Sequence, residues 1–397
     1  MGVLSTTRRR CVWIALAMAL HLAPALDDGW HSGGAPRAQF AGEAFLLQAP
    51  KAEPPMCREE FVMAQPGTAF SHVSSLCELG DGRLAAVWCG GSREGARDVA
   101  VWWATRGQRD TDPWSAPRPI VTRDSAAQET FRFVRKVGNP LLVTGKDGGL
   151  GLVYVTVGIG GWSGSSLNVK VSSDGGRTWS PSQRLGLSPF FNVSELVKNN
   201  AQPLTDGGWA VPVYHEAFGK FPEVLWLHPA RGLIPGRVEA VKSRAFGGRS
   251  AFQPALVAFG PEQAVLLCRA AGSVREIYIT RTTDAGRHWT PPQPSGLPNP
   301  DSGLDAVRLS DGRLLLAFND ATAGRENLRL ALSSDEGVTW RRASTLAEEP
   351  GAEFSYPFLL QTSDGLVHVT YTWKRRNIRH AAFNLAWLDA QADGKNP

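Results

Sequence analysis

Ser172-Ser173-Asp174-Gly175-Gly176-Arg177-Thr178-Trp179 carries the pattern Ser/Thr-x-Asp-x-Gly-x-x-Trp, which returns at Thr282–Trp289 and at Ser333–Trp340. The three aspartates stand at positions 174, 284 and 335, so the spacings are 110 and 51 residues, and the first is about two periods. A degenerate copy is therefore expected at Trp226–Gly232. We interpret the motif as a structural turn, in which Asp binds backbone N–H groups and Trp packs between sheets.

A second repeat supports the same period. Asp-Gly turns between apolar runs begin at five positions, with Gly260-Pro261 in the remaining place: Asp81, Asp147, Asp206, Asp311 and Asp364. Asp-Gly between apolar runs is a strong hairpin signal. The repeats predict six units of about 50 to 65 residues, each with four short strands. We therefore expect an all-β fold, a six-bladed β-propeller of four-stranded antiparallel blades over residues 55–390. A solenoid of six sheets is the alternative.

The N-terminus has the features of an export signal. Arg8–Arg10 precede an apolar run, Val12–Leu26, that is shorter than the roughly 20 residues needed to span a bilayer. Ala23-Pro24-Ala25 matches a signal-peptidase site. Residues 1–25 are predicted to be a signal peptide or an uncleaved anchor, residues 26–54 a linker, and residues 391–397 a tail. We expect a periplasmic or secreted protein, attached to a membrane only through this segment if at all.

Charge and motifs exclude several classes of function. The chain has 42 Lys+Arg and 37 Asp+Glu, and three of the arginines lie in residues 1–25, which contain no acid. The remainder, 39 against 37, is nearly neutral and has no basic run, which argues against a nucleic-acid partner. There is no Walker motif, no strand-linked GxGxxG, no HExxH and no Cys/His cluster, so no cofactor or metal is expected. A monomer is expected.

Polar residues mark one face of the predicted propeller. The Asp-Gly turns and the motif turns must share a face, because strands within a blade are antiparallel. The opposite face, called here the site face, collects strand ends rich in charged and amide groups: His72, Arg93, Glu94, Asp98, Asn139, Lys198, Asn199, His215, Glu216, Gln253, Arg269, Asn299, Asn319, Arg325, Glu353, Tyr356 and Arg375. Strand ends meet water in any protein, but the whole set around a channel mouth predicts a binding or catalytic site.

The repeats, together with four further stretches, resemble the sialidase superfamily, in which the motif is called the Asp box. The stretches resemble most closely the bacterial predicted neuraminidases with BNR repeats: Gly90–Gly95, Leu297–Pro300, Phe354–Pro357 and Tyr371–Trp373. The resemblance covers about Phe61 to Leu388. It implies a glycan substrate.

The resemblance implies roles for several residues. Arg269 and Arg325 match two of the three arginines that bind the substrate carboxylate, but His72 stands in the place of the third. Tyr356 matches the family's nucleophile. Gln253 stands where the family has the glutamate that activates this tyrosine, and an amide cannot take the proton.

The carboxylates are assigned with alternatives. Asp98 fits the family's acid/base position, with Glu94 as the second candidate. Glu353 or Glu216 would have to replace the missing base, and any two of these carboxylates could instead form an ordinary glycosidase pair. Arg93, Lys198, Asn319 and Arg375 are expected to bind substrate.

The leading hypothesis is an exported exo-glycosidase that acts on acidic glycan termini, such as sialic acid or a uronate. The first alternative is a non-catalytic glycan-binding propeller or a polysaccharide-pathway factor. The second is a polysaccharide lyase that uses His72, His215 or Tyr356 as base. We further expect the guanidinium groups of Arg269, Arg325 and Arg375 to converge on one side of the channel mouth. Tyr356 would lie at the floor, Asp98 opposite, and the motif aspartates on the other face.

Overall fold

The computed structural model describes residues 10–16, 38–41, 47–48, 52–109, 112–145, 148–187, 194–229 and 238–392. Most of the predicted signal segment and linker lies outside these ranges, as do Asp147, the end of the degenerate copy Trp226–Gly232, and residues 393–397. Residues 10–16 are helical. Within the described ranges no helix is both long and apolar enough to cross a membrane.

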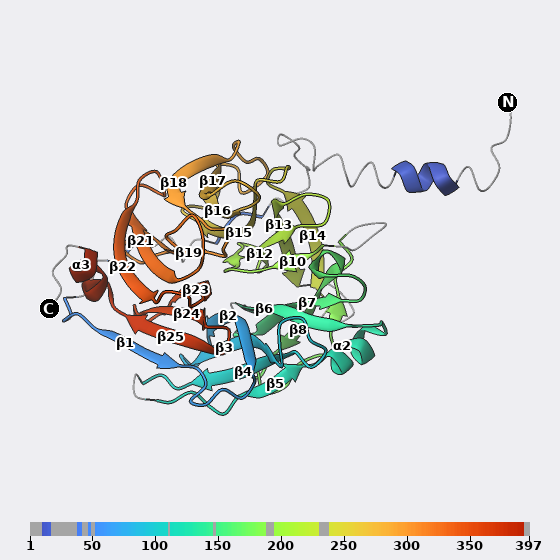
Figure 1. Ribbon diagram of the computed structural model, residues 1–397, viewed down its shortest axis with the longest axis horizontal. Helices are drawn as coiled ribbons and strands as arrows, with labels where there is room; N and C mark the ends of the chain where they lie inside the picture. Colours follow the sequence, from blue (N-terminus) through green and yellow to red (C-terminus); the bar gives the residue numbers. More distant parts are fainter. Residues whose placement is uncertain are drawn as a thin grey trace.

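Six antiparallel sheets form a closed propeller, which confirms the predicted fold (Figure 1). The first blade contains β2 (Phe70–Glu78), β3 (Leu84–Gly91), β4 (Ala100–Arg106) and β5 (Arg118–Val121). The second contains β6 (Lys136–Thr144), β7 (Leu150–Val157), β8 (Ser165–Ser172) and β9 (Gln183–Arg184). The third contains β10 (Leu196–Val197), β11 (Gln202–Pro203), β12 (Trp209–His215), β13 (Phe221–Pro229) and β14 (Val238–Arg244).

The other three blades complete the ring. The fourth contains β15 (Ala251–Ala258), β16 (Ala264–Ala270), β17 (Glu276–Thr282) and β18 (Gln293–Pro298). The fifth contains β19 (Asp305–Arg308), β20 (Leu314–Phe318), β21 (Asn327–Ser333) and β22 (Arg341–Glu348). The sixth contains β23 (Phe354–Gln361), β24 (Val367–Trp373), β25 (Asn377–Phe383) and β1 (Cys57–Phe61). The strands next to the innermost ones, such as β3, β7 and β20, are fully buried and largely apolar, as expected for strands covered on both faces.

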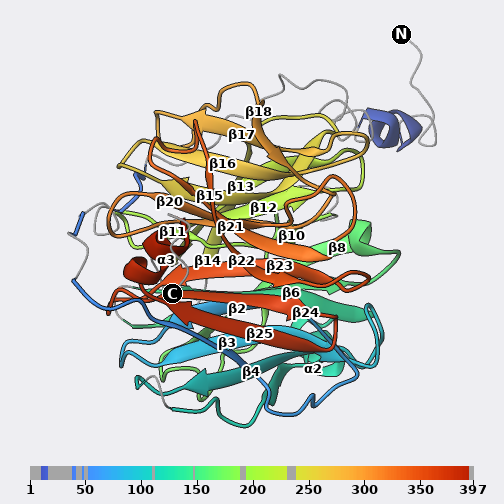
Figure 2. The same ribbon diagram turned by 60° about the vertical axis from the view of Figure 1, so that its left-hand side comes forward.

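The N-terminal strand closes the ring. β1 pairs with β25 in antiparallel register, from Cys57 opposite Phe383 to Phe61 opposite Arg379. The sixth blade therefore takes its outermost strand from the start of the chain, and Figure 2 shows this last blade lying beside the first. The repeat pattern does not predict this exchange, because Cys57–Phe61 has no apolar alternation and no motif turn follows it.

The three motif turns (residues 172–179, 282–289 and 333–340) have the predicted structural role. In the first, the Asp174 carboxylate accepts bonds from the Thr178 backbone N–H at 2.9 Å and from the Ser172 hydroxyl at 2.8 Å. The Trp179 ring packs edge-on against Trp103 of the preceding blade, with ring centroids 5.7 Å apart. The same bonds recur at Asp284 and Asp335. Each turn thus satisfies its own backbone and joins two blades.

Strand register places the motif turns far from the site face. Thr282, which begins the second motif turn, pairs with Ala264 at one end of β16, whereas Arg269 lies at the other end. No motif aspartate lines the pocket that contains Arg269. The prediction that the motif turns and Tyr356 occupy opposite faces is therefore confirmed.

A residue with left-handed backbone interrupts the innermost strand of five blades. The φ angles are 51° at Val73, 44° at Asn139, 73° at Asn199, 51° at Gln253 and 52° at Tyr356. Four of these residues lie at β-bulges, where the strand register shifts. Bulges re-aim side chains and are common beside active sites. Pro140, Pro254 and Pro357 follow three of them, since a bulge tolerates a residue without an N–H.

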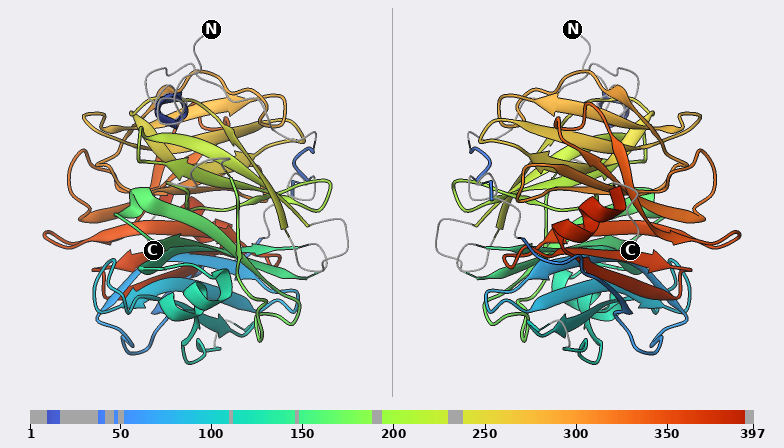
Figure 3. Two further views of the ribbon diagram at one scale, coloured as in Figure 1. Left: turned by 90° about the vertical axis from the view of Figure 1, so that its right-hand side faces the viewer. Right: turned by 90° about the vertical axis from the view of Figure 1, so that its left-hand side faces the viewer.

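Two short helices and one N-terminal segment pack on the propeller. α2 (Arg123–Thr130) precedes the second blade, and α3 (Leu385–Ala392) buries Leu385 and Leu388 near β22 (Figure 3). Within the predicted linker, the Phe40 side chain is almost fully buried against Trp226, and its N–H donates to the Pro261 carbonyl. The described part of this linker is therefore bound to the third and fourth blades.

Candidate active site

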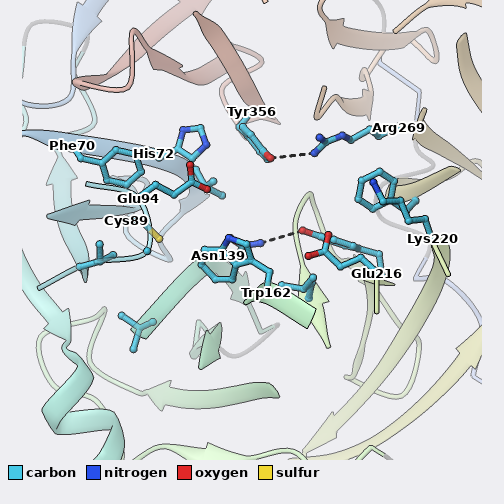
Figure 4. Close-up of a pocket in the computed structure, with 17 residues that line it drawn as sticks. Phe70, His72, Cys89, Glu94, Asn139, Trp162, Glu216, Lys220, Arg269 and Tyr356 are labelled. Carbon is cyan, nitrogen blue, oxygen red and sulfur yellow. Dashed lines mark hydrogen bonds between the residues drawn. The ribbon is translucent and has the colours of Figure 1, made fainter. Parts of the chain in front are cut away.

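One pocket opens on the site face beside the channel axis (Figure 4). Its volume is about 730 Å³ with the open mouth included. Its polar walls come from blades one to four and six: His72, Glu94, Asn139, Tyr214, Glu216, Lys220, Arg269 and Tyr356. Trp162, from the turn Trp162–Gly164 between β7 and β8, and Phe252 add aromatic surface. Aromatic surface with a few convergent polar groups is the usual lining of small-molecule sites.

Tyr356 projects into this pocket from the bulge in β23. Its hydroxyl accepts a hydrogen bond of 3.1 Å from Arg269 Nη1. The His72 ring packs edge-on against the Tyr356 ring, with centroids 4.6 Å apart. Burial and the nearby Arg375 lower the pKa of His72 to about 3, so this histidine is neutral. His72 therefore supports the tyrosine ring and adds no cation to the site.

Arg269 is largely committed to protein partners. Its Nε donates to the Asp301 carboxylate at 2.8 Å, and Nη2 donates to the Asp301 carbonyl at 2.7 Å. Its Nη1 donates to Gln253 Oε1 at 2.9 Å and to Tyr356. A guanidinium has five N–H groups, and four are engaged here. Arg269 therefore positions and polarises Tyr356, but it has no free pair of N–H groups for a bidentate bond to a ligand carboxylate.

A chain of ion pairs continues from Arg269 along the pocket rim. Arg325 donates to Glu353 at 3.2 Å and to the Asp301 carbonyl at 3.0 Å. Arg375 donates through Nε to Glu353 at 2.6 Å and through Nη1 to Glu94. Burial opposes ionisation of Glu353, but the hydrogen bond from Arg375 is the main reason that its pKa falls to about 2.

The three arginines thus converge as expected, but the cluster is already neutralised. The carboxylates of Asp301, Glu353 and Glu94 match the three guanidinium groups one to one. The positive charge of the cluster is therefore balanced within the protein. The expectation that this cluster waits for a substrate carboxylate is therefore corrected.

Glu216 and Glu94 lie on opposite sides of the pocket (Figure 4). Glu216 follows β12 directly, and its backbone N–H donates to the Ser194 hydroxyl at 2.7 Å. Burial raises the pKa of Glu216, although Lys220 and Arg269 oppose the rise. Glu94, by contrast, is ion-paired with Arg375. Carboxylates in such different environments are suited to opposite roles in acid/base chemistry.

Gln253 joins Arg269 to Tyr214 through its side-chain amide. Its amide oxygen accepts from Arg269, and its Nε2 donates to the Tyr214 hydroxyl at 3.2 Å. Asn139 Nδ2 also donates to Tyr214, at 3.3 Å. Burial raises the pKa of Tyr214 far above its usual value, so this phenol remains protonated. Gln253 is therefore a spacer that holds Arg269 against Tyr356, and it has no proton to exchange.

Buried polar residues close the channel below Tyr356. Lys198, which we expected to bind substrate, is 3% exposed and donates to the carbonyls of Leu304 and Pro357 at 3.1 and 2.8 Å. Burial lowers its pKa, and the nearby Asp305 opposes this. Asn319, also expected to bind substrate, is fully buried and donates to the Phe354 carbonyl at 2.8 Å. Both residues brace the blades and do not line the pocket.

Asp98 and Arg93 lie outside the pocket. The Asp98 carboxylate is exposed and accepts bonds from the Ser92 backbone N–H at 2.9 Å and the Ser92 hydroxyl at 2.8 Å. It stabilises the loop that carries Glu94. The prediction that Asp98 faces the arginines across the channel is therefore wrong, and Glu94 occupies that side instead.

Four site residues were not predicted: Tyr214, Lys220, Trp162 and Asp301. Tyr214 directly precedes His215 and Glu216, which the sequence already places at a strand end on the site face. Asp301 directly follows the Leu297–Pro300 stretch. Trp162 stands in a Gly-rich turn, Gly160-Gly161-Trp162, where a large aromatic residue is unusual. Among the described residues, no group of three or more His, Cys, Asp or Glu is suited to hold a metal ion.

Comparison with known proteins agrees with this architecture. The family model of the BNR repeat-like domain matches residues 82–369. The chain belongs to this family. A search of curated proteins finds no match to this BNR repeat-like protein.

Solved structures similar to this BNR repeat-like protein include sialidases and an arabinanase. The Hadza microbial sialidase Hz136 is 18% identical, with a TM-score of 0.65 over 83% of this chain and 68% of that chain. The intramolecular trans-sialidase of Ruminococcus gnavus is 14% identical, with a TM-score of 0.65 over 83% and 97%. The α-L-arabinanase of Penicillium chrysogenum is 13% identical, with a TM-score of 0.60 over 84% and 99%. The TM-scores show a shared propeller fold, and at identities this low the chemistry must be argued from the pocket.

Proposed function

We propose that this protein is an exported exo-glycosidase that removes an acidic sugar from a glycan terminus. One observation carries the proposal: a tyrosine hydroxyl, held by the buried Arg269, shares a pocket with the buried Glu216. The pocket is lined by residues from five blades around the propeller axis, an arrangement that suits the end of a glycan chain. The arginine cluster Arg8–Arg10 and the apolar run after it support export.

The first step uses Tyr356 as nucleophile. Its oxygen bonds to the anomeric carbon as the bond from that carbon to the leaving oxygen breaks. Arg269 stabilises negative charge on the phenol oxygen, in a buried setting where such an interaction is strong. The hydroxyl proton passes to the Glu94 carboxylate, directly or through one water, because Gln253 cannot accept it.

Glu216 supplies the proton to the leaving oxygen. Its raised pKa keeps a fraction of the group protonated at a pH where an ordinary carboxyl is ionised. In the second step water attacks the anomeric carbon and gives its proton to Glu216. The Tyr356 oxygen departs and recovers its proton from Glu94. Two displacements at one carbon give net retention of configuration.

The test is Tyr356→Phe, assayed with aryl glycosides of N-acetylneuraminic acid and of glucuronic acid. We expect the substitution to lower kcat by about three orders of magnitude or more while the sugar still binds, because only the attacking oxygen is removed. The Tyr371→Phe variant, which changes a buried tyrosine outside the pocket, is the control. If the native protein binds the sugars and releases none of the aryl groups, it is a glycan-binding propeller and the proposal fails.

A further inference from the structure

Two lysines remain unpaired at the pocket after the arginine cluster has been balanced. Lys220 lines the pocket, and its Nζ lies over the Phe252 ring, 4.6 Å from the centroid. Lys136 begins β6, and its Nζ lies 3.8 Å from the centroid of the Trp162 ring. Among the described residues, neither ammonium has a carboxylate within ion-pairing distance. Each lysine is therefore held in place by an aromatic face, with its N–H donors available.

Both lysines lie close to the carboxylates and the aromatic walls of the pocket. Lys220 is close enough to Glu216 to oppose the rise of its pKa, and Lys136 does so more weakly. The Lys136 ammonium also lies against the loop of Glu94: a Cβ placed on Gly95 would be 3.2 Å from it. Both aromatic partners, Phe252 and Trp162, are pocket walls. The two cations thus stand on the Phe252 and Trp162 side of the pocket, where Lys220 shares the Phe252 ring with Arg269, whose guanidinium carbon lies 4.8 Å from the ring centroid.

The charge balance of the site favours an anionic ligand on this side. Three arginines are matched by three carboxylates, and Lys198 is matched by Asp305. Among the described residues, the carboxylates close to the two lysines are Glu216 and Glu94. Burial favours the neutral form of Glu216, and Glu94 is already ion-paired with Arg375. The pocket therefore carries an excess of positive charge, which is costly in a partly dry cleft and which an anion would offset.

We propose that Lys220, assisted by Lys136, binds the anionic group of the terminal sugar, and that the arginine cluster does not. This inference rests on the proposed function and specifies how the acidic sugar is recognised. An ammonium is a point charge without the planar fork of a guanidinium. The site therefore accepts tetrahedral sulfate as well as planar carboxylate, and the substrate class widens from sialic acid and uronates to sulfated sugars.

The experiment measures binding and turnover separately. Calorimetric titration gives the affinity of the full protein for N-acetylneuraminic acid, glucuronic acid, glucose 6-sulfate and glucose. We expect the three anionic sugars to bind more tightly than glucose. In Lys220→Met this preference should fall about tenfold or more, since one charged hydrogen bond is lost, and in Lys136→Met less. Lys220→Arg should restore carboxylate binding, which shows that a loss in Lys220→Met is not a folding defect.

Lys374→Met is the matched control. Lys374 also lies over an aromatic ring, 4.5 Å from the Trp373 centroid, but it is paired with Glu349 at 2.6 Å and is outside the pocket. An unchanged preference in Lys220→Met, or equal binding of glucose and the acids by the native protein, would overturn the inference. If the native protein hydrolyses aryl glycosides but Lys220→Met keeps the preference for anionic sugars, only the lysine inference fails. If Lys220→Met loses this preference but the native protein hydrolyses no aryl glycoside, only the glycosidase proposal fails.

Discussion

Burial of the Glu216 carboxyl has a consequence for the pH dependence of activity. A general acid works only while protonated, so kcat/KM should decline as pH rises through the raised pKa of Glu216. In Glu216→Gln this decline should disappear, and kcat/KM should fall by about 10²- to 10⁴-fold for poor leaving groups. Nitrophenyl glycosides should lose much less, because nitrophenolate departs without a proton. An equal loss on both kinds of substrate would contradict the assignment.

Glu353 should make stability sensitive to acid. Its pKa is about 2 in the folded protein against 4.5 for a free carboxyl, so its stabilising effect is complete above about 4.5 and is lost as pH falls toward 2. Glu353→Gln should lower the free energy of unfolding at neutral pH by about 1–2 kcal/mol, a value reduced for partial solvent exposure. Urea unfolding between pH 7 and pH 2 would show the difference in unfolding free energy between the native protein and Glu353→Gln shrinking as the pH falls. A difference that stays constant with pH would contradict the assignment.

Of the site residues, Tyr356 and Arg269 are predictable from the sequence, whereas the carboxylate that faces them is not. Tyr356 and Arg269 were identified through the resemblance, and the structure brings them into hydrogen-bonding contact. Asp98 was preferred over Glu94 from its order in the chain, yet only Glu94 reaches the pocket. The direction of a side chain in an irregular loop depends on local bonds, such as those from Ser92 to Asp98, that residue spacing does not reveal.

Among the elements, the motif turns should contribute to stability and not to catalysis. In Asp284→Ala the bonds from the His288 backbone N–H and the Thr282 hydroxyl, each 2.9 Å, are lost. We expect a loss of about 1–2 kcal/mol in the free energy of unfolding, measured in urea, and an unchanged KM. His288→Ala is the control, because the backbone bond survives in it. A changed KM in Asp284→Ala would mean that the turn communicates with the pocket.

The bulges in the innermost strands mark the limit of what the sequence repeats predict about the site. Two periodicities in the sequence, the motif turns and the Asp-Gly turns, were sufficient to predict six blades and the site face. They could not show that Asn139 and Gln253 adopt left-handed φ angles and re-aim the strands beside the channel. The dipeptides Asn139-Pro140, Gln253-Pro254 and Tyr356-Pro357 carried a signal, because proline inside a buried strand favours a bulge.

For the whole molecule, the ring should depend on β1. Removing residues 1–61 would expose the β25 edge and the inner partners of β1, whereas removing residues 1–37 would leave in place every segment that packs on the propeller in the described part of the chain. We expect the longer truncation to lower the unfolding midpoint by about 10 °C or more, or to aggregate, and the shorter one to change it little. Differential scanning calorimetry of both variants is the measurement. Equal midpoints would show that the ring holds without its closing strand.

Closure by β1 also sets an order of events in folding. Glu59 and Arg379, which form an ion pair across the closing strands, are 320 residues apart in the chain. β1, which is synthesised before the other strands of the blades, therefore cannot pair until β25 has been synthesised. Such a distant contact makes loop closure a late and slow step, and earlier blades form an open arc with unpaired edges. For the export that we propose, this delay is useful, because a chain that crosses a membrane unfolded cannot close its propeller until the last blade has crossed.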